Sequence, residues 1–139
     1  MDSIKISKRI PSVEEYIELR NSVGWKILER DKIKKGLDNS VYCVCIEVKD
    51  TIIGFGRIVG DYGTTFYIQD VIVKPAYQKQ KIGTLIMMNL MKYIDNIYVD
   101  GVIIGLIAIK ELDGFYKKFN FTCNENNMFY RYSLNSKFN

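Results

Sequence analysis

The spacing of apolar positions changes from a helical period to a strand period near residue 40, and this change organises the whole chain. In the first part, Ser12 and Glu15 form an S-x-x-E capping box, in which each side chain satisfies an orphan backbone donor. We therefore expect a helix from there to about Ser22. Its core-facing residues are Val13, Tyr16 and Ile17. A second helix is predicted over Glu29–Leu37, and a short strand over Ile4 to Ile6 precedes both.

Three β-branched and aromatic stretches follow, and short polar turns join them. The predicted strands are Val41–Val48, Ile52–Val59 and Thr64–Val73. Because the connections are too short for crossovers, the three strands should form an antiparallel meander. Gly54 and Gly56 share one face of the second strand. This pattern indicates close approach by a ligand or by another backbone, a bulge, or tight packing.

The apolar spacing returns to a helical period after Pro75. A helix is predicted from Gly83 to about Ile97. Its apolar stripe consists of Ile82, Leu85, Ile86, Leu90, Tyr93, Ile94 and Ile97. The continuous apolar run Val102–Ile107 is typical of a buried strand. The strand–helix–strand unit from Phe66 through Ile107 should place its two strands side by side and parallel.

The last part of the chain predicts one more helix and a strand-like tail. The helix covers about Lys110–Phe119, and its inward residues are Leu112, Phe115 and Phe119. The tail Phe121–Leu134 is apolar enough to be paired inside the sheet or exchanged with a partner, so a homodimer is one expectation. The order of elements predicts a single α/β domain over residues 1–139, with a mixed central sheet flanked by helices.

Composition removes several classes of chemistry. The chain has no histidine, so it has no Ser-His or Cys-His nucleophile, and its three cysteines lack metal-ligand spacing. No apolar run approaches the ~18 residues of a membrane helix, and the N-terminus lacks the pattern of a secretory signal. We therefore expect a cytoplasmic protein without a membrane partner. The net charge of +4 is too mild and scattered to predict a nucleic-acid partner.

A small anionic ligand fits one local cluster better. The third strand of the meander passes through a short loop into the N-terminus of the long helix, where unpaired N–H groups and the helix dipole favour phosphates. Lys79 and Lys81 add positive charge, and Gly83 lets the backbone come close to a ligand. These features leave two readings open, a phosphate site and an ordinary solvated loop.

Two segments carry a resemblance to a known family. Val71–Gly83 resembles the acetyl-CoA-binding motif of the GNAT family of N-acetyltransferases, V-x-P followed by Arg or Gln, two residues, Gly or Ala, any residue and Gly. Gly114–Phe121 is similar to the family's F-Y-x-x-x-G-F segment, and the order of elements is also the family's. Lys81 replaces the first motif glycine, which indicates a loop backbone that is not in a glycine-only conformation. Asn120 replaces the later glycine, and asparagine tolerates a left-handed backbone.

The resemblance implies a role for each matching residue. Backbone groups of three strand residues would pair with the pantetheine arm, namely Val71, Ile72 and Val73. Backbone amides of seven loop and helix residues would wrap the pyrophosphate, namely Gln78, Lys79, Gln80, Lys81, Ile82, Gly83 and Thr84. Tyr116 would lie near the thioester sulfur and give a proton to the leaving CoA thiolate.

The chemistry also needs a base and an acceptor pocket. Asp70, just before the coenzyme-binding strand edge, is the candidate base that takes the ammonium proton, and Glu111 or water alone are the alternatives. A strand amide near Val71 or Ile72 would stabilise the oxyanion. The acceptor side would be lined by Arg20, Trp25, Arg57 and Tyr62.

The expected function is transfer of an acetyl group from acetyl-CoA, a co-substrate, to a primary amine of a small molecule by direct attack on the thioester, without a metal. Two alternatives stay open. One is acetylation of a protein N-terminus or lysine. The other is a catalytically silent CoA-binding sensor, which the replacement of glycine by Lys81 favours.

Overall fold

The structure is a computed structural model that describes residues 3–97 and 101–123. The chain divides into two compact units, one ending at Ile107 and one beginning at Ala108. The first unit contains β1 (Ile4–Ser7), α1 (Val13–Ser22), α2 (Arg30–Asp38), β2 (Tyr42–Val48), β3 (Thr51–Gly60), β4 (Thr65–Val73), the 3-10 turn η1 (Pro75–Tyr77), α3 (Ile82–Ile97) and β5 (Ile103–Gly105). The second contains the 3-10 turn η2 (Lys110–Leu112) and α4 (Asp113–Lys117).

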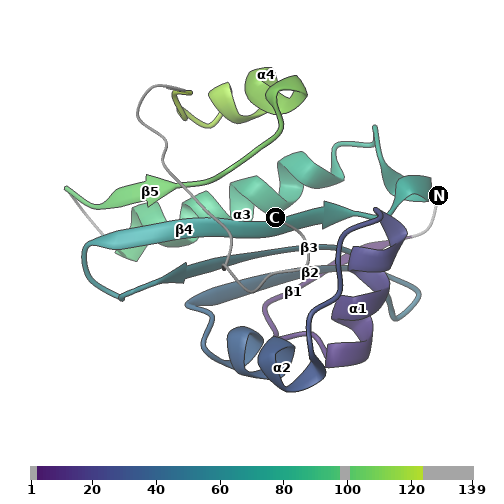
Figure 1. Cartoon of the computed structure of the whole chain (residues 1–139). Coiled ribbons are helices and arrows are strands. Elements are labelled where there is room, and N and C mark those ends of the chain that lie inside the picture. The colour runs from purple at the N-terminus through teal and green to yellow at the C-terminus, as the bar shows by residue number, and fades with distance from the viewer. Residues whose placement is uncertain (1–2, 98–100, 124–139) are drawn as a thin grey trace. The chain divides into compact units, whose positions relative to one another are not determined.

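Within the described residues, five strands form one sheet in the order β1-β2-β3-β4-β5. The pairs from β1 to β4 are antiparallel, and β4 and β5 are parallel. The predicted meander, the parallel crossover and the mixed α/β sheet are therefore confirmed. In the first unit, α1 and α2 lie on one face of the sheet and α3 lies on the other (Figure 1).

The core on the α1 and α2 side is built from alternate strand positions and from one stripe of each helix. Its buried residues are Tyr16, Leu19, Ile33, Leu37, Cys43, Cys45, Ile52, Phe55 and Ile72. Val13 and Ile17 pack against it, so all three core-facing residues predicted for α1 are confirmed. The two core cysteines act as small apolar side chains, and burial raises the pKa of the Cys45 thiol to about 12.

The start of α1 forms as its sequence predicts. The Glu15 amide donates to Ser12 Oγ at 3.1 Å, and the Ser12 amide donates to Glu15 Oε1 at 2.9 Å. Arg9 also donates to both carboxylate oxygens of Glu15 and to Glu47 on β2. These hydrogen bonds, chiefly those from Arg9, lower the pKa of Glu15 to about 2. The capping box therefore also ties the helix start to the sheet.

Two predictions near the end of the chain are wrong. The run Val102–Ile107 is not a buried strand, because β5 is short and Ile103 and Ile107 are 67% and 54% exposed. The helix over Lys110–Phe119 is a 3-10 turn followed by the single short helix α4, and Leu112 is exposed rather than inward. The predicted tail strand lies from residue 124 onward outside the described residues.

The glycine pattern of β3 is explained by tight packing of α3. A Cβ atom built on Gly56 would lie 2.6 Å from Ile86 Cγ2, and one on Gly54 would lie 3.1 Å from Ile82 Cγ2. The helix contributes the buried residues Ile82, Ile86, Met87, Leu90 and Ile94. The predicted stripe extends too far, since Ile97 is exposed, and it omits Met87. Glycine at these two positions therefore lets the helix approach the sheet.

We expect Gly56→Ala to lower the free energy of unfolding by about 1 to 3 kcal/mol, because the new methyl group overpacks the contact with Ile86. Gly36→Ala is the matched control. Gly36 lies inside α2 with nothing within 4 Å of its built Cβ, so the same change should stabilise by up to about 1 kcal/mol. Urea denaturation measures both variants, and equal stability of Gly56→Ala and the wild type would contradict the packing account.

Candidate active site

A β-bulge interrupts β4 in the middle of the sheet. Phe55 pairs with Ile72 and Arg57 pairs with Gln69, so Asp70 and Val71 together lie opposite the one residue between them on β3. Asp70 has a φ of 58°, in the left-handed region that aspartate tolerates better than most residues. The bulge bends β4 and turns the Asp70 side chain into the face that α1 covers.

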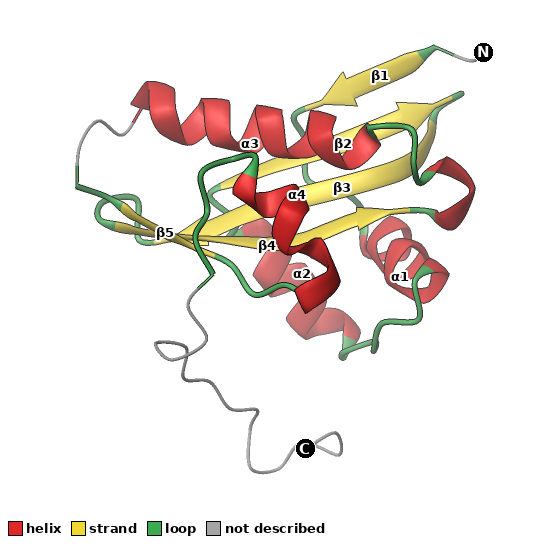
Figure 2. Ribbon diagram, turned by 90° about the horizontal axis from the view of Figure 1, so that it is seen from above, coloured by secondary structure: helices red, strands yellow, loops and turns green. Residues whose placement is uncertain are grey.

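The second half of β4 has one unpaired edge. The short strand β5 pairs only with Thr65, Phe66 and Tyr67, as Figure 2 shows for the first part of β4. From Ile68 to Val73, no described strand occupies the edge opposite β3. The predicted pantetheine-binding residues Val71–Val73 lie within this stretch. Backbone groups on an edge that no described strand pairs suit an extended ligand that adds to a strand.

The loop after β4 is sharply bent by two left-handed lysines. Lys79 has a φ of 62° and Lys81 a φ of 66°. The Gln78 side chain donates to the Val73 carbonyl at 2.9 Å, and the Gln80 side chain donates to the Ala76 carbonyl at 3.3 Å. Bends of this kind turn successive N–H groups into concavities that bind anions.

The start of α3 follows directly and adds further donors. The first N–H groups of a helix have no intrahelical partner, and here these belong to Ile82, Gly83 and Thr84. The seven residues predicted to bind the pyrophosphate therefore form one continuous segment that runs from Gln78 through the loop into the first turn of α3.

Lys81 has a φ of 66°, in the small left-handed region that glycine favours and that L-residues can also adopt. A lysine takes this conformation here, so it is not one that only glycine can adopt. The inference drawn from Asn120 is confirmed, since that residue has a φ of 69°. Both residues that replace a motif glycine therefore have a positive φ.

Asp70 forms the centre of a buried polar cluster, and its side chain is 0% exposed. Its Oδ2 accepts from Tyr16 Oη at 2.6 Å and from Arg57 Nε at 2.9 Å. Its Oδ1 accepts from Arg20 Nη1 at 3.0 Å and from Gln69 Nε2 at 3.2 Å. An ionised carboxylate has about four acceptor positions, so these four donors occupy them all.

The four hydrogen bonds decide whether Asp70 can act as the predicted base. Asp70 has no lone pair left for an ammonium proton unless one of its four donors moves away. Burial and the neighbouring Asp70 charge raise the pKa of Tyr16 to about 12, so its phenol stays protonated and keeps donating. The geometry suits a carboxylate that positions its neighbours.

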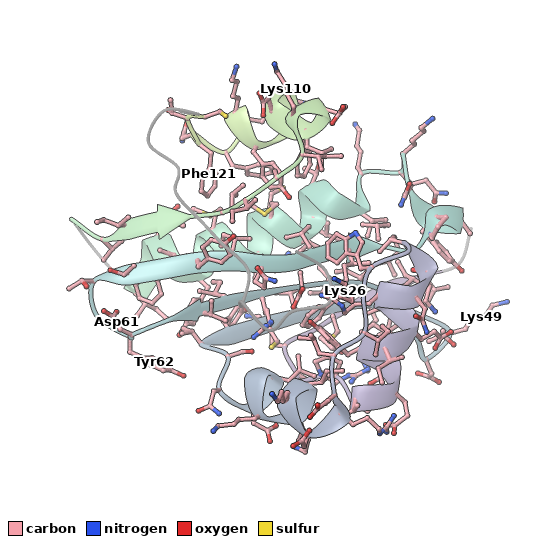
Figure 3. All side chains as sticks on the ribbon, viewed as in Figure 1. Lys26, Lys49, Asp61, Tyr62, Lys110 and Phe121 are labelled. Carbon is pink, nitrogen blue, oxygen red and sulfur yellow. The ribbon has the colours of Figure 1, made fainter. Side chains whose placement is uncertain are left out.

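The structure brings together three of the residues predicted from different parts of the chain: Arg20, Arg57 and Asp70. Trp25 joins them, because the Arg20 guanidinium lies 5.4 Å from the centroid of its ring. Tyr16 was interpreted only as a core residue, although its spacing of four from Arg20 places both on one face of α1. Tyr62 lies in the β3–β4 turn at one end of the sheet (Figure 3), and no described contact links it to this cluster.

In the second unit, Tyr116 packs within an aromatic group. Its ring centroid lies 4.9 Å from that of Phe115 and 6.3 Å from that of Phe121. Burial raises the pKa of the Tyr116 phenol, which therefore carries a proton at neutral pH. Glu111, the alternative base, is exposed.

A search of residues 3–97 and 101–123 finds no group of three or more metal-ligating side chains that could hold a metal ion. The same part of the chain contains no helix that is long and apolar enough to cross a membrane.

Comparison with known proteins places the chain in a family. The model of the acetyltransferase (GNAT) family matches residues 10–121. The chain belongs to the GNAT family. The matched range includes the residues of the bulge, the unpaired edge of β4 and the loop into α3.

Two curated relatives are described as uncharacterised N-acetyltransferases. The chain is 32% identical over 114 residues to an uncharacterised N-acetyltransferase (ycf52) of Gracilaria tenuistipitata var. liui, covering 79% of this chain and 62% of that protein. A related protein of Pyropia yezoensis is 31% identical over 77% of this chain and 63% of its own length. The chain thus spans less than two thirds of these curated relatives.

Solved structures match along nearly their whole length. A probable acetyltransferase of unknown function from meticillin-resistant Staphylococcus aureus is 40% identical, with a TM-score of 0.87 over 94% of this chain and 98% of that one. A GNAT protein from Streptococcus pneumoniae is 25% identical, with a TM-score of 0.74 over 94% and 98%. The GNAT fold of this chain is therefore well matched by experimental structures.

We expect Asp70→Asn to lower the free energy of unfolding by about 3 to 5 kcal/mol, because it leaves two arginines, each only 14% exposed, without their carboxylate. Asparagine also tolerates the left-handed backbone, so the loss reports the charge. The control is Asp38→Asn, which breaks an exposed pair with Lys34 and should change stability by less than about 0.5 kcal/mol. Guanidinium denaturation would contradict the account if both variants were as stable as the wild type.

Proposed function

We propose that this GNAT protein transfers the acetyl group of acetyl-CoA to the primary amine of a small molecule. The observation that carries the proposal is the unpaired stretch of β4 beside the bulge, which leads directly into the bent loop and the N-terminus of α3. An extended amide-bearing arm and a pyrophosphate need these two features in this order along the chain.

The residues of this chain fit such a coenzyme. Backbone groups of Val71 to Val73 would pair with the pantetheine arm, and the amides from Gln78 to Thr84 would bind the pyrophosphate. Lys79 and Lys81 would add positive charge beside it. When bound, acetyl-CoA supplies an activated acetyl thioester. A backbone N–H of Val71 or Ile72 would donate to the carbonyl oxygen as it gains negative charge.

Proton transfers are assigned to Tyr116 and to solvent. Tyr116 would give its proton to the leaving thiolate, a role supported by its place in the family motif. Asp70 would act as a positioning residue, because its acceptor positions are filled. Water would then take the proton from the acceptor ammonium. Holding amine and thioester together would supply much of the rate.

The backbone of the loop weighs against the sensor alternative. The replacement of a motif glycine favours that alternative, yet Lys81 has a φ of 66°, which a glycine at that position could also adopt. The loop leads into the N–H groups of Ile82, Gly83 and Thr84, which have no intrahelical partner and could donate to a pyrophosphate. No comparable observation favours a protein or peptide acceptor over a small amine.

We expect acetyl-CoA to bind the purified protein saturably, and Gly83→Trp to abolish binding, because the indole would fill the space that the ligand needs beside the first turn of α3. Calorimetric titration measures both. Met88→Trp is the control, since Met88 is exposed on the same helix and the variant should bind like the wild type. A folded wild type that does not bind millimolar acetyl-CoA would sink the proposal.

We expect Tyr116→Phe to lower kcat about a hundredfold or more, because the leaving thiolate loses its proton donor, while the Kd for acetyl-CoA changes little. The measurement is release of free CoA thiol with the best amine from a screen. Tyr42→Phe is the control, because Tyr42 stacks on Tyr93 outside the proposed machinery and its loss of a hydroxyl should leave kcat unchanged. An unchanged kcat in Tyr116→Phe would remove this residue from the mechanism.

A further inference from the structure

We propose that the acceptor amine carries an anionic group, a carboxylate or a phosphate, which Arg20 and Arg57 bind on the α1 side of the β4 bulge. This inference rests on the proposed acetyltransferase function and names the chemical class of its second substrate. It follows from the charge, the free donors and the location of the cluster around Asp70.

The cluster holds more positive than negative charge. The described ion pairs of Arg20 and Arg57 both go to Asp70, so two guanidinium groups share one carboxylate and one positive charge is left over. Each arginine side chain is only 14% exposed. An uncompensated charge that is largely removed from water is costly, and a bound anion would balance it.

Each arginine also has donors left for a ligand. Arg20 donates from Nε to the Lys26 carbonyl, and from Nη1 to Asp70 Oδ1 and Tyr16 Oη. Arg57 donates from Nε to Asp70 Oδ2, and from Nη1 to the Gly36 carbonyl and Ser40 Oγ. No hydrogen bond to another described residue occupies either Nη2. Since no buried side-chain nitrogen or oxygen in the described part of the chain lacks a partner, both Nη2 groups contact solvent.

The two guanidinium groups are held in place before any ligand arrives. Arg57 is fixed between β4 and the end of α2 by contacts of 2.9 to 3.2 Å. Arg20 lies 5.6 Å from the Tyr16 ring centroid and 5.4 Å from that of Trp25. A rigid guanidinium loses little entropy when it binds, and its planar fork matches carboxylate and phosphate oxygens.

The location connects this cluster with acetyl transfer. Asp70 immediately precedes Val71–Val73, the unpaired stretch proposed for the coenzyme arm. An acceptor anchored by its anion at Arg20 and Arg57 would hold its amine beside that edge. Trp25, 41% exposed over Arg20, would cover the apolar part of such a molecule. A cationic polyamine would be repelled by the same cluster.

The test compares two pairs of amines in which one member carries an anionic group and the other carries a neutral group at the same position. The pairs are β-alanine against its amide, and 2-aminoethyl phosphate against 2-aminoethanol. We expect kcat/KM at saturating acetyl-CoA to favour the charged member of at least one pair by about tenfold to a hundredfold, the effect of one charge-assisted contact. The pair with the preference identifies the anion as carboxylate or phosphate. Titration of the same four amines onto the CoA-bound protein measures the preference without turnover.

Three variants test whether the preference for the charged amine comes from this cluster or from the overall charge of the protein. Arg20→Gln should bring the charged-to-neutral ratio close to one, and its fold should hold because Arg57 still pairs with Asp70. Arg20→Lys keeps the charge but not the fork and should retain part of the preference. Arg30→Gln, which removes an exposed arginine paired with Glu14, should keep the wild-type ratio.

Equal kcat/KM and equal affinity for charged and neutral members of both pairs would overturn the inference and leave the acetyltransferase proposal intact. A preference that Arg20→Gln retains would also overturn it. Absence of acetyl-CoA binding would overturn the acetyltransferase proposal, and with it the acceptor role of the cluster. These outcomes are distinguishable because the titrations with coenzyme and with amines are separate measurements.

Discussion

The fully coordinated carboxylate of Asp70 is the interaction on which the first unit depends. It accepts from α1 through Tyr16 and Arg20, and from β3 through Arg57. Arg57 in turn donates to the Gly36 carbonyl at the end of α2. One carboxylate on the bulged strand therefore fixes both N-terminal helices against the sheet. The edge of β4 that β5 leaves unpaired begins at Ile68, so the carboxylate that fixes the helices lies within the stretch of strand proposed for the ligand.

The two faces of the sheet solve different packing problems. On one face the glycines of β3 let α3 approach closely, which brings the start of that helix next to the end of β4. On the other face, polar side chains replace apolar contacts around Asp70, at a depth where each donor must be matched. A coenzyme arm on the β4 edge would thus lie between a tightly packed helix and a preformed polar cluster, which is the arrangement that two-substrate transfer needs.

Local patterns predicted the elements well and the long-range contacts poorly. The capping box of Ser12 and the β-branched runs encode α1 and the meander directly. Arg20 and Asp70, fifty residues apart, meet only because the strand bulges, and no local period reveals a bulge. The apolar run before Ile107 indicates burial, but exposure depends on neighbouring chain segments rather than on composition. Family motifs identified the candidate coenzyme residues, whereas the partners of Asp70 needed three-dimensional structure.

The two left-handed lysines of the loop have a consequence for the unfolded chain. A glycine at either position would sample many backbone conformations before folding and would lose that freedom when the loop forms. Lysine samples fewer, so part of the ordering cost is absent, although the left-handed backbone itself is disfavoured. A loop with lysine at these positions samples fewer backbone conformations than one with glycine. It should present its amides to an anion with little further loss of entropy, which favours fast and uniform capture over adaptable binding.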